Sequence, residues 1–92
     1  MMSKTPVNLE KIGKEDLNKE ILRTGVIAEM DAINLYEQMA ALTTKVSIKK
    51  VLLDIAKEEK THVGEFLTLL LEEDREQQKE LEQGKKEVEK SR

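Results

Sequence analysis

The sequence predicts an all-α chain: an antiparallel two-helix hairpin that pairs with a second chain into a four-helix bundle, plus a charged C-terminal helix or tail. Three observations predict it. Apolar residues recur at steps of three and four over two long stretches, as on one face of a helix. A short polar break separates these stretches. A glutamate and the only histidine interrupt the apolar face of the second stretch, so this face meets either water or a positive charge.

The composition suits long helices that associate with other chains. Apolar residues fill 38% of the 92 positions, with one Phe, one Tyr and no Trp, so the core of this single domain has to be aliphatic. A core of that size buries a modest fraction of the surface, which favours self-association. Charged residues make up another 38% and there is one Pro, as is typical of solvated helices.

The same composition excludes several classes of protein. A net charge of −3 and few aromatic residues leave no basic face and no base-stacking platform, so we expect no nucleic-acid partner. No apolar run approaches the roughly 20 residues that span a membrane, and no signal peptide is visible, so we expect a cytoplasmic protein with no membrane partner. The absence of cysteine excludes a disulfide scaffold, a cysteine–zinc site and an iron–sulfur centre.

Three segments follow from changes in composition. Residues 1–13 hold the only Pro, lack clear periodicity and are predicted to be an N-terminal arm. Residues 14–72 are predicted to form the helical hairpin. Residues 73–92 have Leu81 and Val88 as their only apolar residues and are predicted to be a charged C-terminal helix or linker. As a helix, this segment could pack its two apolar residues on a neighbouring subunit.

The first helix of the hairpin is predicted to begin near Gly13–Glu15 and to end at about Leu42. Glu15 and Asp16 favour its N-terminus, because acidic residues stabilise the positive end of the helix dipole. Two adjacent stripes are directed inward. One comprises Ile21, Gly25, Ala28, Ala32, Leu35, Met39 and Leu42, and the other Leu22, Gly25, Glu29, Ala32, Tyr36 and Met39.

The second helix is predicted over about Ile48–Leu71, with Ser47 as its N-cap. Residues 43–45, Thr-Thr-Lys, break the apolar pattern between the helices, and so short a connection favours an antiparallel hairpin. The apolar seam of this helix runs in steps of four and three through Ile48, Leu52, Ile55, Glu59, His62, Phe66 and Leu69. Glu59 and His62 therefore occupy two consecutive positions of a heptad seam.

Glu29 is predicted to lie at the same height as Glu59. Each is 15 residues from Thr44, the centre of the predicted turn, and antiparallel helices rise equally per residue. His62 follows Glu59 on the same face, and the small side chains of Gly25 and Ala32 beside Glu29 admit close packing. One hairpin thus offers two carboxylates and one imidazole at one level.

Three such side chains make half of a known kind of site. Carboxylate-bridged di-iron bundles use one Glu from each of two helices and a Glu-x-x-His from each of the other two. Two copies of this chain would supply all six ligands, and four carboxylates would balance two ferrous ions. Iron or manganese suits such ligands, and zinc can replace them. The alternative is an ordinary Glu–His pair on a solvated helix face, because Glu is common in this chain.

The segments 26–40 (VIAEMDAINLYEQMA) and 52–66 (LLDIAKEEKTHVGEF) closely resemble the two long helices of encapsulated ferritins, the half-ferritin cargo of encapsulin nanocompartments. The resemblance extends over about residues 15–72. It implies a ferritin-like four-helix bundle formed by two chains, with Glu29, Glu59 and His62 from each chain as catalytic metal ligands. Tyr36 falls near the iron. The resemblance also implies a dimer-built homo-oligomer, such as a decameric ring, whose ferroxidase centres oxidise iron for storage inside an encapsulin shell.

Two positions depart from the pattern of some relatives, which carry Glu at a metal-entry site. This chain has Ala28 and Asp31 there, so Asp31 is either an entry ligand or a solvated carboxylate. Glu58 and Glu65 are either surface charges or partners that orient His62 from the second shell. The last residues also lack the apolar targeting peptide of separate cargo chains. We therefore expect the cargo half of a fusion to the shell protein, a trimmed chain, or a member loaded in another way.

The predicted function is oxidation of Fe²⁺ to Fe³⁺ by dioxygen, with two iron ions per pair of chains and Mn, Zn or Ca as substitutes. The predicted location is cytoplasmic, within an encapsulin nanocompartment. One alternative is a rubrerythrin-like di-iron peroxidase, which usually needs a rubredoxin partner, and this chain has no cysteine to form one. The other alternative is a non-catalytic hairpin that oligomerises, with Glu59 and His62 facing a wet channel.

Overall fold

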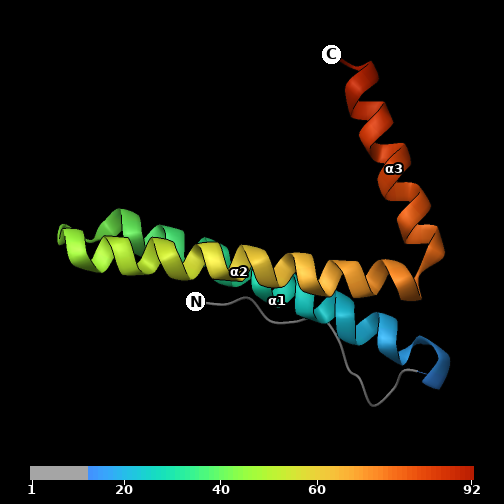
Figure 1. Cartoon of the computed structure of the whole chain (residues 1–92), viewed down its shortest axis with the longest axis horizontal. Helices are drawn as coiled ribbons and strands as arrows, with labels where there is room; N and C mark the ends of the chain where they lie inside the picture. Colours follow the sequence, from blue (N-terminus) through green and yellow to red (C-terminus); the bar gives the residue numbers. More distant parts are fainter. Residues whose placement is uncertain (1–12) are drawn as a thin grey trace.

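The computed structural model describes residues 13–92, which form three helices and confirm the all-α prediction. Helix α1 spans Lys14–Leu42, α2 spans Val46–Glu73 and α3 spans Arg75–Lys90. Figure 1 shows α1 and α2 side by side in an antiparallel hairpin, with α3 leaving its open end. The predicted N-terminal arm, residues 1–13, lies outside the described residues except for Gly13. None of the three helices is long and apolar enough to cross a membrane.

The hairpin turns within the three residues that break the apolar pattern. Helix α1 ends as predicted at Leu42, where the Thr43 N–H donates to the Met39 carbonyl. The Lys45 N–H then donates to the Thr43 hydroxyl over 3.2 Å. The prediction that Ser47 caps α2 is wrong. The N-cap is Lys45, which makes no side-chain cap, and Ser47 lies inside the helix. Helix α2 therefore begins at Val46, two residues before the predicted apolar seam begins at Ile48.

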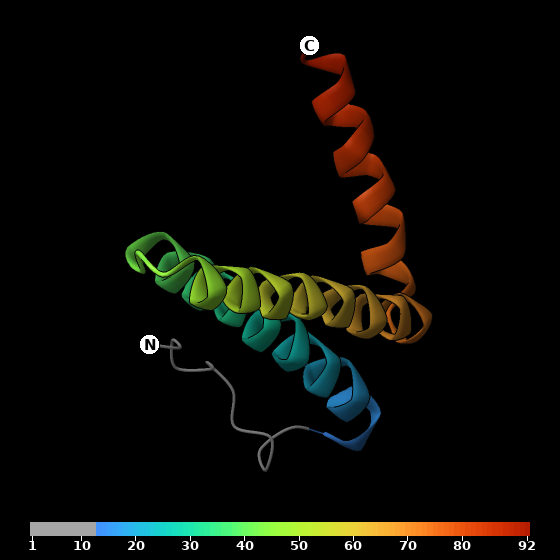
Figure 2. The same cartoon turned by 60° about the vertical axis from the view of Figure 1, so that its left-hand side comes forward.

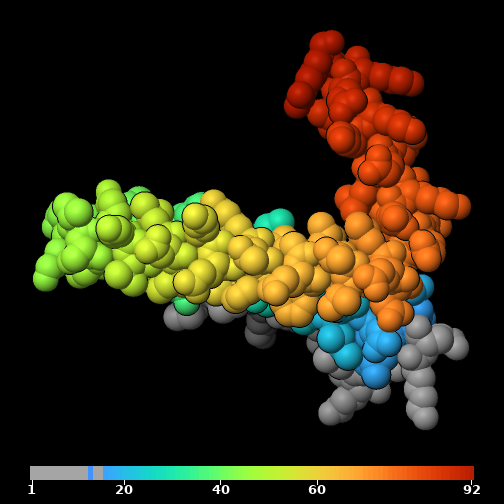
Figure 3. All heavy atoms as spheres, viewed as in Figure 1, coloured from blue at the N-terminus to red at the C-terminus, as the bar shows by residue number. Residues whose placement is uncertain are grey.

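The two long helices pack through small side chains and leave much apolar surface uncovered. The buried core consists of Ala32, Ile33, Ala40, Ala56 and Leu70. Large apolar side chains stay exposed along both helices, including Val46, Ile48, Val51 and Leu69 on α2. The radius of gyration is 16.3 Å, whereas a compact chain of this length has about 12 Å. The described chain is therefore an elongated rod with a projecting arm (Figure 3), and it leaves apolar surface uncovered.

Helix α3 projects away from the hairpin in both views of the ribbon (Figures 1 and 2). The structure therefore shows residues 75–90 as a helix rather than an irregular linker. Leu81 and Val88 are 42% and 52% exposed, so neither is covered within the single chain.

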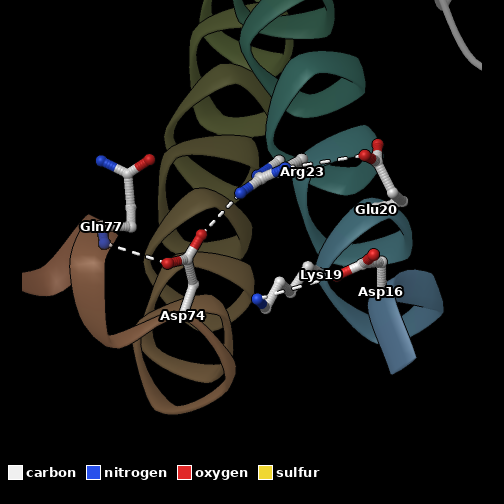
Figure 4. Close-up of polar contacts among 6 residues, drawn as sticks. All are labelled: Asp16, Lys19, Glu20, Arg23, Asp74 and Gln77. Carbon is white, nitrogen blue, oxygen red and sulfur yellow. Dashed lines mark hydrogen bonds and ion pairs between the residues drawn. The ribbon is translucent and has the colours of Figure 1, made fainter.

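A buried carboxylate at the corner directs α3. Asp74 is 8% exposed and separates α2 from α3. Its Oδ1 accepts from the Gln77 N–H over 3.0 Å, which caps α3, and its Oδ2 accepts from Arg23 of α1 over 2.5 Å (Figure 4). These two hydrogen bonds, the Gln77 N–H first and the Arg23 guanidinium second, hold the pKa of Asp74 below its ordinary value. One side chain therefore joins all three helices.

We predict that Asp74→Asn loosens α3 without unfolding the hairpin. Asparagine caps helices as well as aspartate does, so the variant keeps the cap and loses the charge that pairs with Arg23. Backbone amides of residues 75–90 should exchange faster with deuterium, while those of α1 and α2 keep their rates. Asp54→Asn, which removes an exposed carboxylate from α2, should leave amide exchange unchanged in all three helices. Unchanged exchange in α3 of Asp74→Asn would contradict this role.

Wild type and Asp74→Asn should also differ in how their unfolding free energy depends on pH. The pKa of Asp74 is lower in the folded chain than the unfolded value of about 3.9. Asp74 therefore stabilises the fold above that pH and loses this contribution as the pH falls through the lowered folded pKa. The difference in unfolding free energy between wild type and Asp74→Asn should shrink on acidification. A difference that grows toward low pH would overturn the assignment.

Candidate metal centre

The structure brings Glu29, Glu59 and His62 together between the two long helices. Glu29 comes from α1 and the other two from α2, at the level where equal distances from the turn predict them to meet. His62 Nδ1 lies 3.6 Å from Glu29 Oε1 and 3.4 Å from Glu59 Oε2. One ligand atom from each residue lies within 4.8 Å of the other two, the spacing of a group that can hold a metal ion.

The cluster carries two acidic groups in a place of restricted access to water. The side chains of Glu29 and Glu59 are each 19% exposed, whereas that of His62 is 45% exposed. Glu29 Oε2 is buried and has no hydrogen-bond partner. A buried acceptor without a partner costs free energy, so this oxygen is suited to a positively charged ligand.

The chemistry and spacing of the three side chains fit a divalent metal. Carboxylate oxygen and imidazole nitrogen bind such ions at about 2.0–2.2 Å, so two ligands of one ion can be up to about 4.2 Å apart. The distances from His62 to both carboxylates fall within that reach. Iron, manganese and zinc all accept this mixed donor set. Three side chains would leave coordination positions open for water or for further ligands.

The open side of the cluster is continuous with the apolar seam of α2. No member of the seam is buried within the single chain, and its two ends, Ile48 and Leu69, are 47% and 50% exposed. The remaining members, Leu52, Ile55, Glu59, His62 and Phe66, are half-buried. Anything that covers this seam would also enclose the His62 side chain, which is 45% exposed.

Other residues named from the sequence stand outside the cluster. In the described part of the chain, the only group of three or more potential metal ligands is Glu29, Glu59 and His62. Asp31 is half-buried and lies two residues beyond Glu29, hence on another face of α1, and Glu58 and Glu65 are exposed. Tyr36 is half-buried two turns after Glu29 on the inward stripe.

Sequence reasoning missed one ion pair beside the cluster. Lys60 Nζ lies 3.0 Å from Glu37 Oε2, which joins α2 to α1 next to Glu59. In the sequence both residues look like ordinary charges on solvated helix faces. Their pairing depends on how α1 and α2 are aligned in the hairpin, which the structure shows. Both side chains are well exposed, so the pair contributes little to stability.

The fold and this cluster define an all-α, ferritin-like protein whose facing helices carry a carboxylate–imidazole group. The chain belongs to the EncFtn-like family, whose model matches residues 4–87. This finding confirms the resemblance to encapsulated ferritins.

Two matches come from Pyrococcus furiosus. A ferritin-like-encapsulin shell fusion protein is 52% identical over 84 residues, which are 91% of this chain and 24% of that protein. The chain thus spans about a quarter of the length of this relative. The crystal structure of an encapsulated ferritin domain matches with a TM-score of 0.83 and 49% identity, covering 98% of this chain and 92% of the other. The predicted fold is confirmed by this match.

We predict that a divalent metal stabilises the protein through these three side chains. A ligand that binds the folded state alone raises the unfolding free energy by about 2.7 kcal/mol at 100 times its Kd. Co²⁺ should therefore raise the melting temperature of the wild-type protein and have little effect on Glu59→Gln or His62→Ala. Glu72→Gln removes an exposed carboxylate of the same helix and should respond as the wild type does. An equal shift in all four proteins would place the bound metal elsewhere.

Proposed function

We propose that this domain oxidises Fe²⁺ to Fe³⁺ with dioxygen, at a site formed by Glu29, Glu59 and His62 from each of two chains. The observation that carries the proposal is the convergence of these three side chains on the uncovered face of the hairpin. The buried, unpartnered Glu29 Oε2 supports a cation there. The ligand set also matches half of the pattern of carboxylate-bridged di-iron bundles.

Two chains are needed for both coordination and charge. Each chain supplies two carboxylates, so a pair supplies four, and two ferrous ions carry the matching positive charge. Without such ions, bringing two clusters together would crowd four acidic groups into a poorly solvated space, which costs several kcal/mol. Iron binding and pairing should therefore stabilise each other.

In the proposed site each side chain has a defined part. Glu29 and Glu59 hold the Fe²⁺ substrate from opposite helices, and a carboxylate can accommodate the ferrous and ferric ions by changing between one-oxygen and two-oxygen contacts. His62 binds through a ring nitrogen, which requires the neutral imidazole, and the Nδ1 atom faces the carboxylates. The electrons come from the iron, so the chain supplies spacing, charge balance and access. Mn, Zn or Ca could occupy the same ligands.

The cellular setting is proposed from the relatives. The Pyrococcus furiosus protein is named a ferritin-like-encapsulin shell fusion, which supports a role beside an encapsulin shell for this domain. We propose that iron oxidised here is stored within such a nanocompartment in the cytoplasm. Residues 14–72 would form the working hairpin, and residues 73–92 would join a neighbouring subunit of a ring such as a decamer. Asp31 and Glu58, which lie outside the cluster, would attract iron toward it, while Tyr36 on the inward stripe would lie near the bound iron.

The first prediction from this proposal concerns iron stoichiometry and rate. Anaerobic Fe²⁺ titration followed by air should give rapid oxidation of about one iron per chain, because two chains share two ions. The Glu59→Ala/His62→Ala double variant should lose this fast phase, measured as the ferric absorbance in the near ultraviolet. Glu72→Gln should retain it. Oxidation by the double variant at the wild-type rate would disprove the mechanism and leave a structural hairpin.

The second prediction concerns the uncovered seam. Leu69→Lys places a charge on the face that we propose to be covered by the second chain, so pairing and fast iron oxidation should both be lost. Leu53→Lys is the matched control, since Leu53 is similarly exposed on α2 but lies off the seam. It should keep assemblies of at least two chains by sedimentation and should oxidise iron normally. Full activity of Leu69→Lys would rule out pairing through this face.

A further inference from the structure

Of Gly25, Gly64 and Gly84, only Gly25 has atoms close to the position that a Cβ would take, and these belong to Phe66. An added Cβ on Gly25 of α1 would lie 2.8 Å from Cδ1, 2.9 Å from Cε1 and 3.0 Å from Cγ of the Phe66 ring on α2. Carbon atoms pack best at about 3.5–4.0 Å, so a methyl group there would require the Phe66 ring, or the helix that carries it, to shift by roughly 0.7 Å or more. The Phe66 ring can lie this close to the backbone of α1 because position 25 has no side chain.

The contact is adjacent to the metal cluster on both helices. Gly25 precedes Glu29 by four residues, and Phe66 follows His62 by four, so each lies one helical turn from a proposed ligand on the same face. A change in helix separation at this level is passed to the cluster over a single turn of about 5.4 Å. Gly64 in α2 and Gly84 in α3 have no such role, since a Cβ added at either position would meet no atom within 4 Å.

Metal sites tolerate little change in the spacing of their ligands. Workable distances lie within about 0.2 Å of the preferred values. The displacement that a methyl group at position 25 would impose exceeds that tolerance several-fold. Where the shift is passed to the helices rather than absorbed by the ring, Glu29 would move relative to Glu59 and His62, although all three side chains would remain present.

We propose that the Gly25–Phe66 contact sets the separation between Glu29 and the Glu59–His62 pair, which makes Gly25 and Phe66 positioning residues of the metal site. This inference rests on the proposed function, since it assigns a spacer to the same site. It differs from ordinary core packing because it predicts a loss of metal affinity in a chain that still folds and assembles.

The test is a double-mutant cycle with Co²⁺ as the probe. Wild type, Gly25→Ala, Phe66→Ala and the Gly25→Ala/Phe66→Ala double variant are titrated with Co²⁺, following its visible spectrum. Far-ultraviolet circular dichroism and sedimentation report helix content and assembly. Gly64→Ala is the matched control, because it adds the same methyl group to a helix where nothing is in the way.

Gly25→Ala should weaken Co²⁺ binding about tenfold to hundredfold, the usual effect of disturbing the support of a metal ligand. Gly64→Ala should bind as the wild type does. Phe66→Ala removes all three ring atoms that the methyl group would meet, so adding Gly25→Ala to it should cost little further affinity.

Wild-type affinity in Gly25→Ala would overturn the proposal. If Gly25→Ala does not assemble, Phe66→Ala and the double variant still decide the matter. Equal Co²⁺ affinity of Phe66→Ala and the double variant supports the role of the Gly25–Phe66 contact in positioning the ligands. Weaker Co²⁺ binding by the double variant than by Phe66→Ala overturns it. Failure of the wild-type protein to bind Co²⁺ would instead count against the proposed metal function, so the two failures are distinguishable.

Discussion

The meeting of two carboxylates and one imidazole across a thin helical hairpin is the constraint on which the rest of the structure depends. Glu29 and Glu59 lie in a place of limited access to water, and Glu29 Oε2 has no hydrogen-bond partner. A dry core without a positive partner would hold these charged groups only at a high cost in free energy. A shared cation and a second hairpin are a physical solution, and the exposed seam of α2 is the surface on which that second hairpin would pack.

The features around the cluster serve the same arrangement. Alanines at positions 32, 40 and 56 and the glycine at position 25 let α1 and α2 approach closely, at the expense of a large apolar core within the single chain. Apolar side chains stay exposed because two helices alone cannot cover all of each other's apolar surface. At the far end, Asp74 ties the direction of α3 to α1 through Arg23, so the arm that reaches away from the hairpin is held by a specific contact.

Much of this fold could be predicted from the sequence, because it depends on local periodicity. The hairpin and the facing of Glu29 and Glu59 follow from apolar spacing and from counting residues on each side of the turn. The cap of α2 could not be predicted in this way, since Ser47 is a good N-cap residue in isolation, whereas the helix begins at Val46, directly after a turn in which the Lys45 N–H donates to the Thr43 hydroxyl. Residues 75–90 carry too few apolar residues for their pattern to separate a helix from a linker.

The contacts that the sequence did not reveal join residues far apart in the chain. Arg23 and Asp74 are 51 positions apart, and each would be an unremarkable charge on a helical surface without the other. Phe66 against Gly25 is similar: the small residue indicates close packing, but only the structure identifies the ring that fills the space. Such pairs depend on the rotation of one helix about the other, which apolar periodicity leaves loosely defined.

The central claim is that the cluster is half of a metal site completed by a second copy of the chain. Anomalous scattering at the iron edge, from crystals grown with Fe²⁺ under anaerobic conditions, tests it most directly. The expected result is two iron peaks between a pair of hairpins, in contact with Glu29, Glu59 and His62 from both chains. Iron held by these residues within one isolated hairpin, or no iron at the cluster, would contradict the claim.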